Sequence, residues 1–161
     1  MAYYEIPKFE GKVEGQRLIW ETAGELVYIE PYGMDAIRFR SSKSLKIDEE
    51  LNWTLLPPGE TPDVTIEMDE EKAVLVNGKI SVEITGDGTV TYYHTQTGKI
   101  LLEEYWIDGR VHTAPLRRAR EYRVTSGNQF KLSLYFKPYQ NEHFYGMGQD
   151  ANDCFDLKGS T

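Results

Sequence analysis

Short runs in which apolar and polar residues alternate recur from about residue 16 to residue 137, with turn residues between them. The runs cover residues 17–21, 25–30, 35–40, 63–68, 72–84, 89–94, 99–106, 121–125 and 129–137. A period of two is typical of strands that bury one face, and no stretch repeats apolar residues at helical spacing over three turns. Strands at this density, joined by short turns, predict an all-β fold, an antiparallel β-sandwich.

The strongest local signal is the hairpin expected over residues 72–84. Asn77-Gly78 favours a two-residue type I′ turn, because both central residues of that turn need positive φ. With this loop Leu75 lies opposite Ile80, and opposed residues share a face of the sheet. The residues expected to be buried are Ala73, Leu75, Ile80, Val82 and Ile84, and those expected to be exposed are Lys79, Ser81 and Glu83.

Composition narrows the classes of partner. The chain has 161 residues, about one domain, with 18 basic and 26 acidic residues and a net charge of −8. Nucleic acids and anionic membranes require a positive surface, so neither is expected as a partner. Arg117, Arg118 and Arg120 form the densest basic cluster, and we expect it to be solvated.

Targeting and cysteine signals are sparse. Cys154 is the only cysteine, so the chain can form neither an internal disulfide nor a multi-cysteine metal site. Residues 1–12 show no basic region followed by an apolar stretch, and no run approaches the roughly 18 apolar residues of a membrane helix. We expect a cytoplasmic protein.

The candidate cofactor and metal motifs lack the neighbouring residues that each kind of site would need. Gly146–Ala151 fits the loose G-x-G-x-x-A form of a dinucleotide loop, but the residues that follow are poor helix formers. His94, His112 and His143 share no ligand spacing, and Cys154 is better explained as a buried small residue than as a nucleophile paired with His143. No cofactor and no metal are expected.

Paired carboxylates are the groups that glycosidases use, and two places supply them. Glu103 and Glu104 are neighbours in an expected strand, so they face opposite sides of the sheet and cannot flank one bond. A second acidic cluster lies between Asp150 and Asp156, where a polar loop is the simpler explanation. The residue chemistry alone therefore predicts no catalytic residue.

The segment His143–Gln149 (HFYGMGQ), followed by Phe155–Gly159 (FDLKG), resembles the end of the N-terminal domain of glycoside hydrolase family 31, the α-glucosidases and α-xylosidases. Members show an aromatic-Tyr-Gly-Leu-Gly-Glu/Gln string and soon afterwards a polar stretch with Lys-Gly. The runs Val76–Ile80 and Thr97–Leu102 are similar to the paired hairpins that precede the string. The resemblance spans roughly residues 20 to 161.

The resemblance implies a galactose mutarotase-like sandwich that precedes a (β/α)8 catalytic barrel, which carries the nucleophile and the acid. A barrel needs about 250 residues, so we expect this chain to be the sandwich without its barrel. The barrel's Trp-x-Asp-Met motif is absent, because Trp106-Ile107-Asp108 is followed by Gly109, and Asp108 is not a credible nucleophile.

The resemblance also divides the chain into an extension (1–15), the sandwich (16–145) and the start of a loop toward the active site of the barrel (146–161). That loop would wall the substrate pocket through a small polar set: Gln149, Asp150, Asp156 and Lys158. We expect the segment 146–161 to be the least settled part of the isolated chain, and Tyr145 to anchor it on the sandwich.

We therefore expect a non-catalytic N-terminal domain of a retaining α-glycosidase, whose partners are its own barrel and, through the full enzyme, an α-linked glucoside or xyloside. One alternative is a free-standing carbohydrate-binding module, which would need an exposed aromatic platform. The candidates for that platform are Tyr92, Tyr93, Tyr105 and Trp106, although Tyr92 and Tyr93 must face opposite ways. A second alternative, a mutarotase-like enzyme, would need a histidine and a carboxylate that converge in one cleft.

Overall fold

The computed structural model describes residues 6–22, 24–49, 54–60, 64–105, 118–127, 129–145 and 156. These residues form eleven strands and no helix, so none of them belongs to a helix that could cross a membrane. The strands are β1 (Gly11–Glu14), β2 (Arg17–Thr22), β3 (Glu25–Pro31), β4 (Ile37–Ser42), β5 (Val64–Met68), β6 (Lys72–Asn77), β7 (Ile80–Thr85), β8 (Val90–His94), β9 (Ile100–Glu103), β10 (Arg120–Ser126) and β11 (Gln129–Leu134). The all-β fold predicted from the period of two is confirmed.

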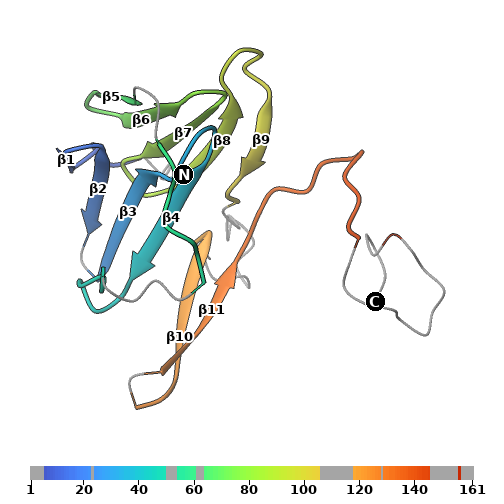
Figure 1. Ribbon diagram of the computed structural model, residues 1–161. Helices are drawn as coiled ribbons and strands as arrows, with labels where there is room; N and C mark the ends of the chain where they lie inside the picture. Colours follow the sequence, from blue (N-terminus) through green and yellow to red (C-terminus); the bar gives the residue numbers. More distant parts are fainter. Residues whose placement is uncertain are drawn as a thin grey trace.

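The strands form two layers and a ribbon, with antiparallel pairing throughout (Figure 1). The first sheet has the order β1-β2-β3-β4, and the second has the order β5-β6-β7-β8-β9. The third unit, β10 paired with β11, projects from one end of the sandwich and is called the ribbon below. The predicted antiparallel sandwich therefore holds for the layered part of the chain.

The ribbon continues the second sheet beyond β9. After β11 the chain runs antiparallel to the end of β9, where the Lys137 N–H donates to the Glu103 carbonyl at 2.9 Å. The Tyr105 N–H donates to the Tyr135 carbonyl at 2.9 Å, and Glu104 pairs with Phe136 in a bridge. The second sheet is consequently wider than the first.

The core lies between the two sheets. Its buried members are Phe9, Leu18, Trp20, Val27, Ile29, Ala73, Leu75, Val82, Ile84 and Val90. Gly88 in the β7–β8 turn has a φ of 83°, and a Cβ at this position would overlap with the Trp20 ring. The turn therefore needs glycine both for its backbone conformation and for the close approach of the core tryptophan.

The β6–β7 hairpin has the predicted faces but a different register. The two loop residues are Gly78 and Lys79 in place of Asn77 and Gly78, so Leu75 lies opposite Val82 and Ala73 opposite Ile84. The predicted pairing is thus wrong by two residues. Because side chains alternate with a period of two, a shift of two leaves every residue on its predicted face.

A tertiary contact moves the turn. The fully buried Asn77 donates from Nδ2 to two carbonyls of the β3–β4 loop, at 2.8 and 2.7 Å, so it serves as the last residue of β6. The Lys79 N–H donates to Oδ1 of Asp35 in the same loop at 2.7 Å. Gly78 has a φ of 61°, and a Cβ there would overlap with the Asp35 carboxylate. The sequence of the hairpin alone contains none of this information.

Most of the predicted burial within the hairpin holds. Ala73, Leu75, Val82 and Ile84 are buried, and Lys79 is exposed.

Three residues of the hairpin differ from the prediction. Ile80 and Glu83 are half-buried, and Ser81 is buried although it was expected to be exposed. Ser81 lies between the larger side chains of Val76 and Tyr93 on the outer face, where a small hydroxymethyl group is shielded by its neighbours.

The N-terminal segment contributes more than the predicted extension over residues 1–15. Gly11–Glu14 pairs with β2 as an edge strand of the first sheet. Phe9 enters the core, and its N–H donates to the Glu70 carbonyl at 2.8 Å. The pattern of alternation misses β1 because all four residues of this strand are exposed, so no buried face marks it.

We predict that Val82→Ala lowers the free energy of unfolding by about 1–3 kcal/mol, because it leaves a cavity at a fully buried site. The matched control is Glu83→Ala on the other face of the same strand, which removes a part-exposed ion pair with Lys72 (2.7 Å) and should cost less than about 1 kcal/mol. Urea titration of both variants measures the two costs. Equal costs would contradict the assigned faces.

Candidate functional site

The most deeply buried cation that the structure describes is Arg120, the first residue of β10, which is 7% exposed. The expectation that the arginine cluster is solvated is wrong for this residue, although it holds for the exposed Arg118. Arg117 lies outside the described residues. Arg120 is buried because it lies on the ribbon face that turns toward the sandwich, where two carboxylates neutralise its charge.

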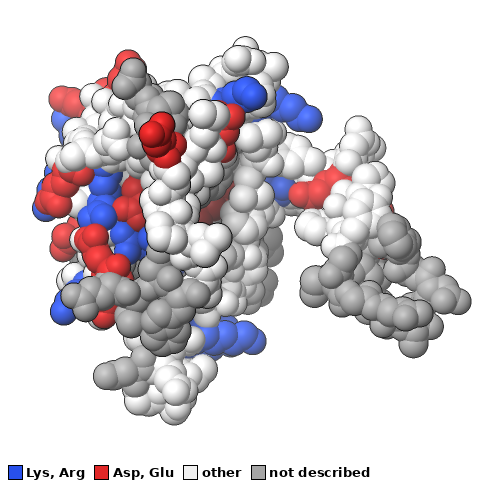
Figure 2. Space-filling view, in the orientation of Figure 1, with Lys and Arg blue, Asp and Glu red and all other residues white. Residues whose placement is uncertain are grey.

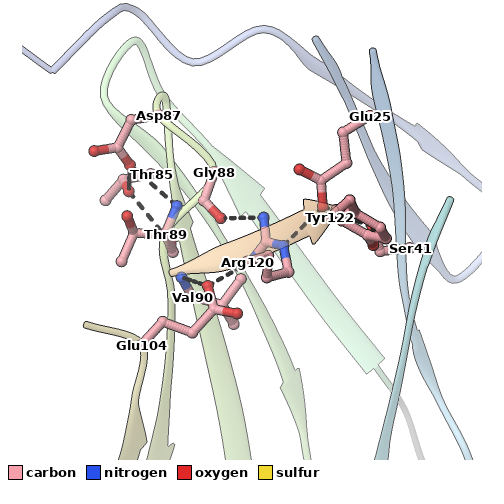
Figure 3. Close-up of polar contacts among 10 residues, drawn as sticks. All are labelled: Glu25, Ser41, Thr85, Asp87, Gly88, Thr89, Val90, Glu104, Arg120 and Tyr122. Atoms are coloured by element: carbon pink, nitrogen blue, oxygen red, sulfur yellow. Dashed lines mark hydrogen bonds and ion pairs between the residues drawn. The ribbon is translucent and has the colours of Figure 1, made fainter. Parts of the chain in front are cut away.

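Arg120 joins three parts of the fold (Figure 3). Its Nε donates to Oε1 of Glu25 at the start of β3 (2.8 Å), and its Nη1 donates to Oε2 of Glu104 just after β9. Its Nη2 donates to the Gly88 carbonyl in the β7–β8 turn at 2.7 Å. The guanidinium also lies over the Phe39 ring, 5.2 Å from its centroid. One side chain thus connects the ribbon to both sheets.

The carboxylates of this centre have further donors. The Val90 N–H donates to Oε2 of Glu104 at 2.9 Å, and the Ser41 hydroxyl donates to Oε1 of Glu25 at 2.6 Å. Ser41 in turn lies 2.5 Å from the hydroxyl of Tyr122 on β10. Every member of the network is therefore held by a second contact, which is the condition for burying charge at a tolerable cost.

The centre carries two carboxylates for one guanidinium, so it has an excess negative charge when both are ionised. Burial raises the pKa of Glu104, while the positive charge of Arg120 and the Val90 N–H act in the opposite direction. Removal of the carboxylate from water is the larger effect. A proton on Glu104 would leave the centre neutral.

Two carboxylates around one centre raise the question of glycosidase chemistry. Such enzymes place a pair of carboxyl groups across a glycosidic bond, with room for a sugar ring and water between them. Here Glu25 and Glu104 bind the same guanidinium, and the cavity beside Glu25 and Arg120 has a volume of about 10 Å³. That volume holds about one water molecule. The pair can stabilise the fold but cannot bind a glycoside.

The predicted opposition of Glu103 and Glu104 is present. Glu104 points into the centre, whereas the half-buried Glu103 accepts hydrogen bonds from Tyr139 (2.7 Å) and Lys137 (3.2 Å) on the other side. The two neighbours therefore take part in separate networks, and they do not form a catalytic pair.

Among the predicted pocket-wall residues, Asp156 is described and Gln149, Asp150 and Lys158 lie outside the described residues. Asp156 accepts from the ring Nδ1–H of His143 at 2.6 Å and from the Phe144 N–H at 3.1 Å. These contacts bring position 156 back against the start of the tail motif. Apart from Asp156, the segment 146–161 that we expect to be least settled falls outside the described residues, as do Asp108 and Cys154.

Tyr145 does not anchor on the sandwich, contrary to expectation. It is 57% exposed and stacks on the His143 ring at 6.0 Å within the tail, which leads away from the sheets (Figure 1). The histidine and carboxylate required by a mutarotase-like enzyme do meet at His143 and Asp156. Their side chains are 56% and 36% exposed, so the pair forms an open hydrogen bond and not a desolvated catalytic dyad.

The aromatic residues considered for a sugar-binding platform do not share one exposed face. Tyr92 packs against the core opposite Val82, and burial raises its pKa to about 12. Tyr93 lies on the opposite face of β8, as its neighbouring position requires. Tyr105 is exposed, and Trp106 lies outside the described residues. Because Tyr92 packs against the core, these residues do not form the exposed aromatic platform that a carbohydrate-binding module would need.

The outer face of the first sheet carries interleaved charges, visible beside β1–β4 in Figure 2. Glu30 binds Arg17 at 2.8 Å and Arg40 at 2.7 Å, and Arg17 also binds Glu49 at 2.7 Å. Tyr28 lies below the guanidinium groups of Arg17 and Arg40, 4.5 and 5.4 Å from its ring centroid. Glu30 and Glu49 neutralise Arg17 and Arg40, so this face is no basic patch for nucleic acid.

No group of three or more metal-binding side chains lies close enough to hold an ion within the part of the chain that the structure describes. His94 contacts the Thr97 hydroxyl at 3.2 Å, and His112 lies outside this part.

Sequence reasoning missed the buried centre, although a signal for it exists. Glu25 is in phase with Val27 and Ile29 along β3, so it occupies a core-facing position. Glu104 is likewise in phase with Leu102, and Arg120 with Tyr122. A charge at an apolar phase in each of three extended segments indicates buried ion pairing.

We predict that Arg120→Met lowers the free energy of unfolding by about 3–5 kcal/mol, because it leaves two buried carboxylates without their cation. Arg118→Met is the matched control, two residues away on an exposed position, and should cost less than about 0.5 kcal/mol. Urea titration at neutral pH compares the two. A cost below 1 kcal/mol for Arg120→Met would contradict a structural role for the centre.

A second prediction concerns pH. The pKa of Glu104 in the folded protein lies above its ordinary value of 4.5, so the folded state binds this proton more tightly than the unfolded state does. The resulting contribution to the free energy of unfolding is fully present at low pH and is lost as pH rises through the folded pKa. Glu104→Gln cannot ionise. The stability of the variant relative to wild type should therefore increase as pH rises above about 4.5, in urea titrations at several pH values. Parallel stability curves for the two proteins would contradict the raised pKa.

Comparison with known proteins finds relatives of the chain in sequence and in structure. No protein-family model matches the chain. Over 155 residues it is 29% identical to an "uncharacterized family 31 glucosidase ORF2" of Pseudescherichia vulneris, covering 88% of this chain and 29% of that relative. A family 31 α-xylosidase from a soil metagenome, crystallised with xylose, has a TM-score of 0.80 and 30% identity, covering 93% of this chain and 24% of its own.

The chain thus spans 29% and 24% of the length of these two relatives. The two likenesses cover 88% and 93% of the present sequence. The resemblance inferred from the tail motif is confirmed: the chain is related in sequence and fold to the glycosidases of glycoside hydrolase family 31, and it corresponds to a limited part of them.

Proposed function

We propose that the chain is the non-catalytic N-terminal β-sandwich domain of a retaining α-glycosidase. The observation that carries this proposal is the asymmetry of the structural match, which includes 93% of this chain but 24% of the α-xylosidase. A match of that kind is what a domain gives against a multidomain enzyme. The catalytic groups would then belong to the barrel that the resemblance implies, and not to this chain.

The carboxylates of the sandwich support a non-catalytic role. Glu25 and Glu104 form buried ion pairs with Arg120, and the cavity beside this centre has space for about one water molecule. Glu103 faces away from them and binds Tyr139 and Lys137. Within the described residues, each of these three carboxylates already has a structural partner.

The role that we propose for the domain is to pack on the barrel and to wall one side of the substrate pocket. The wall would be formed by the tail, through Gln149, Asp150, Asp156 and Lys158. The contacts of Asp156 with His143 and with the Phe144 N–H support this role, because they fold the tail back on itself next to its family motif. A folded tail can present polar groups to a pocket with little ordering cost.

The substrate in this proposal is an α-linked glucoside or xyloside, and it is bound by the full enzyme. The two relatives are named as a glucosidase and an α-xylosidase, so the proposal includes both sugars. No cofactor is included, since retaining glycosidases use carboxyl groups alone. The cytoplasmic location expected from the sequence remains part of the proposal.

A free-standing sugar-binding module is the competing interpretation, and it requires aromatic rings that lie in one exposed plane. Tyr92 is in the core and Tyr93 is on the opposite face, so this requirement is not met by the predicted set.

We predict that the purified chain hydrolyses neither nitrophenyl α-glucoside nor nitrophenyl α-xyloside, even at high protein concentration. The physical reason is that Glu25, Glu103 and Glu104 are held in structural networks, and in this proposal the nucleophile and the acid belong to the barrel. Release of nitrophenol measures the activity, and Asp156→Asn is the variant for comparison. Turnover that survives purification and is lost in Asp156→Asn would overturn the non-catalytic assignment. An NMR titration of the isotope-labelled chain with maltose and with xylose tests the competing interpretation. A sugar-binding module predicts amide chemical-shift changes that cluster on one face of a sheet.

A further inference from the structure

Asn77-Gly78, at the junction of β6 and the β6–β7 turn, carries chemistry of its own besides the shape of the turn. The backbone nitrogen that follows an asparagine can attack the side-chain carboxamide carbon. This reaction is fastest when the following residue is glycine, which has no side chain to obstruct the attack. Among the five asparagines of the chain, Asn77 is the one that precedes glycine. The sequence therefore concentrates this reactivity at one position.

The reaction needs water as its co-reactant and involves no oxidation or reduction. The Gly78 nitrogen loses its proton and forms a bond to Cγ of Asn77, and the side-chain nitrogen leaves as ammonia, which gives a cyclic succinimide. Water then opens the ring. Hydrolysis at the former side-chain carbonyl gives aspartate at position 77. Hydrolysis at the former backbone carbonyl gives isoaspartate, in which the main chain runs through the former side chain.

The folded protein holds the carboxamide away from this reaction. Nδ2 of Asn77 donates to the Gly33 carbonyl at 2.8 Å and to the Ala36 carbonyl at 2.7 Å, and the residue is fully buried. Because the carboxamide is directed at the β3–β4 loop, attack by the Gly78 nitrogen requires it to rotate and to break both hydrogen bonds. Water must also reach a side chain that has no exposed surface.

Exposure of Asn77 requires more than fraying of the turn. β6 lies inside the second sheet, paired with β5 on one side and with β7 on the other. Ala73 and Leu75, which are in phase with Asn77, are fully buried in the core. Opening such a strand costs nearly the full free energy of unfolding. The reaction rate of Asn77 in the folded protein should therefore follow the unfolded fraction, which is roughly 10⁻³ to 10⁻⁶ for a folded domain.

The fold also disfavours the aspartate product. In aspartate a carboxylate oxygen replaces the donor Nδ2, so it would face the carbonyl oxygens of Gly33 and Ala36. No donor among the described residues reaches Oδ1 of Asn77, so the second carboxylate oxygen would have no partner there either. A buried charge with neither a donor nor a cation is strongly destabilising.

Isoaspartate disturbs the turn in a different way. It adds a carbon atom to the main chain at the position where Asn77 pairs with Ile80. Gly78 has a φ of 61° and lies against the Asp35 carboxylate, whose Oδ1 accepts from the Lys79 N–H at 2.7 Å. A longer main chain moves this closely packed turn off the β3–β4 loop.

We propose that Asn77 is a deamidation site that the folded sandwich blocks and the unfolded chain exposes, and that the deamidated chain does not return to this fold. Unfolding thereby becomes irreversible for molecules that stay unfolded long enough to react. The inference goes beyond the proposed function and does not depend on it.

A time course on the wild-type chain tests the block. Peptide mass spectrometry follows deamidation of Asn77 at mildly alkaline pH, in buffer and in guanidinium chloride that unfolds the chain. The folded chain should react at least about a hundredfold more slowly than the unfolded chain, as its unfolded fraction requires. Asn141, which is exposed and precedes Glu142, is the internal control and should react slowly in both states. Comparable rates for Asn77 in the two states overturn the proposal, as does an unreactive Asn77 in the unfolded chain.

Two variants of β7 separate unfolding from a local reaction of the folded turn. Val82→Ala should raise the deamidation rate in buffer by about the factor by which it raises the unfolding equilibrium constant in urea. Glu83→Ala, on the other face of the same strand, is the matched control and should change both quantities little. An unchanged rate in Val82→Ala would mean that the folded turn itself reacts, which contradicts the block.

Refolding tests the fate of the product. Chains held unfolded at mildly alkaline pH should lose refolding yield in proportion to the deamidated fraction. Chains held unfolded at mildly acidic pH should refold fully, because the Gly78 nitrogen loses its proton too slowly there.

Asn77→Asp supplies the aspartate product directly, and it should raise the unfolding equilibrium constant at least about tenfold or prevent folding. Asn141→Asp is the matched control and should leave the urea midpoint unchanged. Full refolding of deamidated chains, or an Asn77→Asp chain as stable as wild type, overturns the proposal. None of these measurements involves the glycosidase assay, so this proposal and the proposed function fail separately.

Discussion

The buried ion pairs of Arg120 with Glu25 and Glu104 hold the ribbon and the two sheets in their relative positions. The three side chains come from the ribbon, from the first sheet and from the end of the second sheet, and the Gly88 carbonyl adds the β7–β8 turn. Leaving any one of these charges alone inside the protein would cost several kcal/mol. The three segments that carry these side chains must therefore pack together for the charges to be paired. The planar guanidinium of arginine fixes their relative orientation better than apolar contacts of the same area would.

The same requirement explains what could be predicted from the sequence. A period of two is a local property, so it located ten of the eleven described strands and kept the faces of the β6–β7 hairpin correct. The register was displaced by two because Asn77 and Lys79 bind the β3–β4 loop, more than forty residues away in sequence. β1 was missed because an edge strand with every residue exposed has no apolar phase.

The candidate site divides in the same way. The tail motif was sufficient to identify the relatives, because it is a contiguous string of residues. The buried centre was not identified, because Arg120 and Glu25 are 95 residues apart and each alone resembles an ordinary surface charge. The decisive clue was the phase: Glu25 is in phase with Val27 and Ile29, which point into the core, and Arg120 is in phase with Tyr122 and Val124 on the apolar face of its strand. A charge that keeps the apolar phase of its strand is a stronger indication of a buried partner than a charge in a basic cluster.

The buried ion pairs and the exposed ribbon face have one structural origin. A sandwich whose second sheet is wider than its first must end its core somewhere, and here the core ends at Arg120, with Tyr122 and Ser41 at its margin. A polar network suits that boundary, because its charges are satisfied on the covered side of the ribbon while the side chains beyond it are about half exposed. An apolar residue in place of Arg120 would extend the apolar core directly onto the exposed face of the ribbon. It would also leave the orientation of the ribbon relative to the two sheets without a directional contact. The buried ion pairs instead hold the base of the ribbon against both sheets, so the ribbon projects from the sandwich at a defined angle.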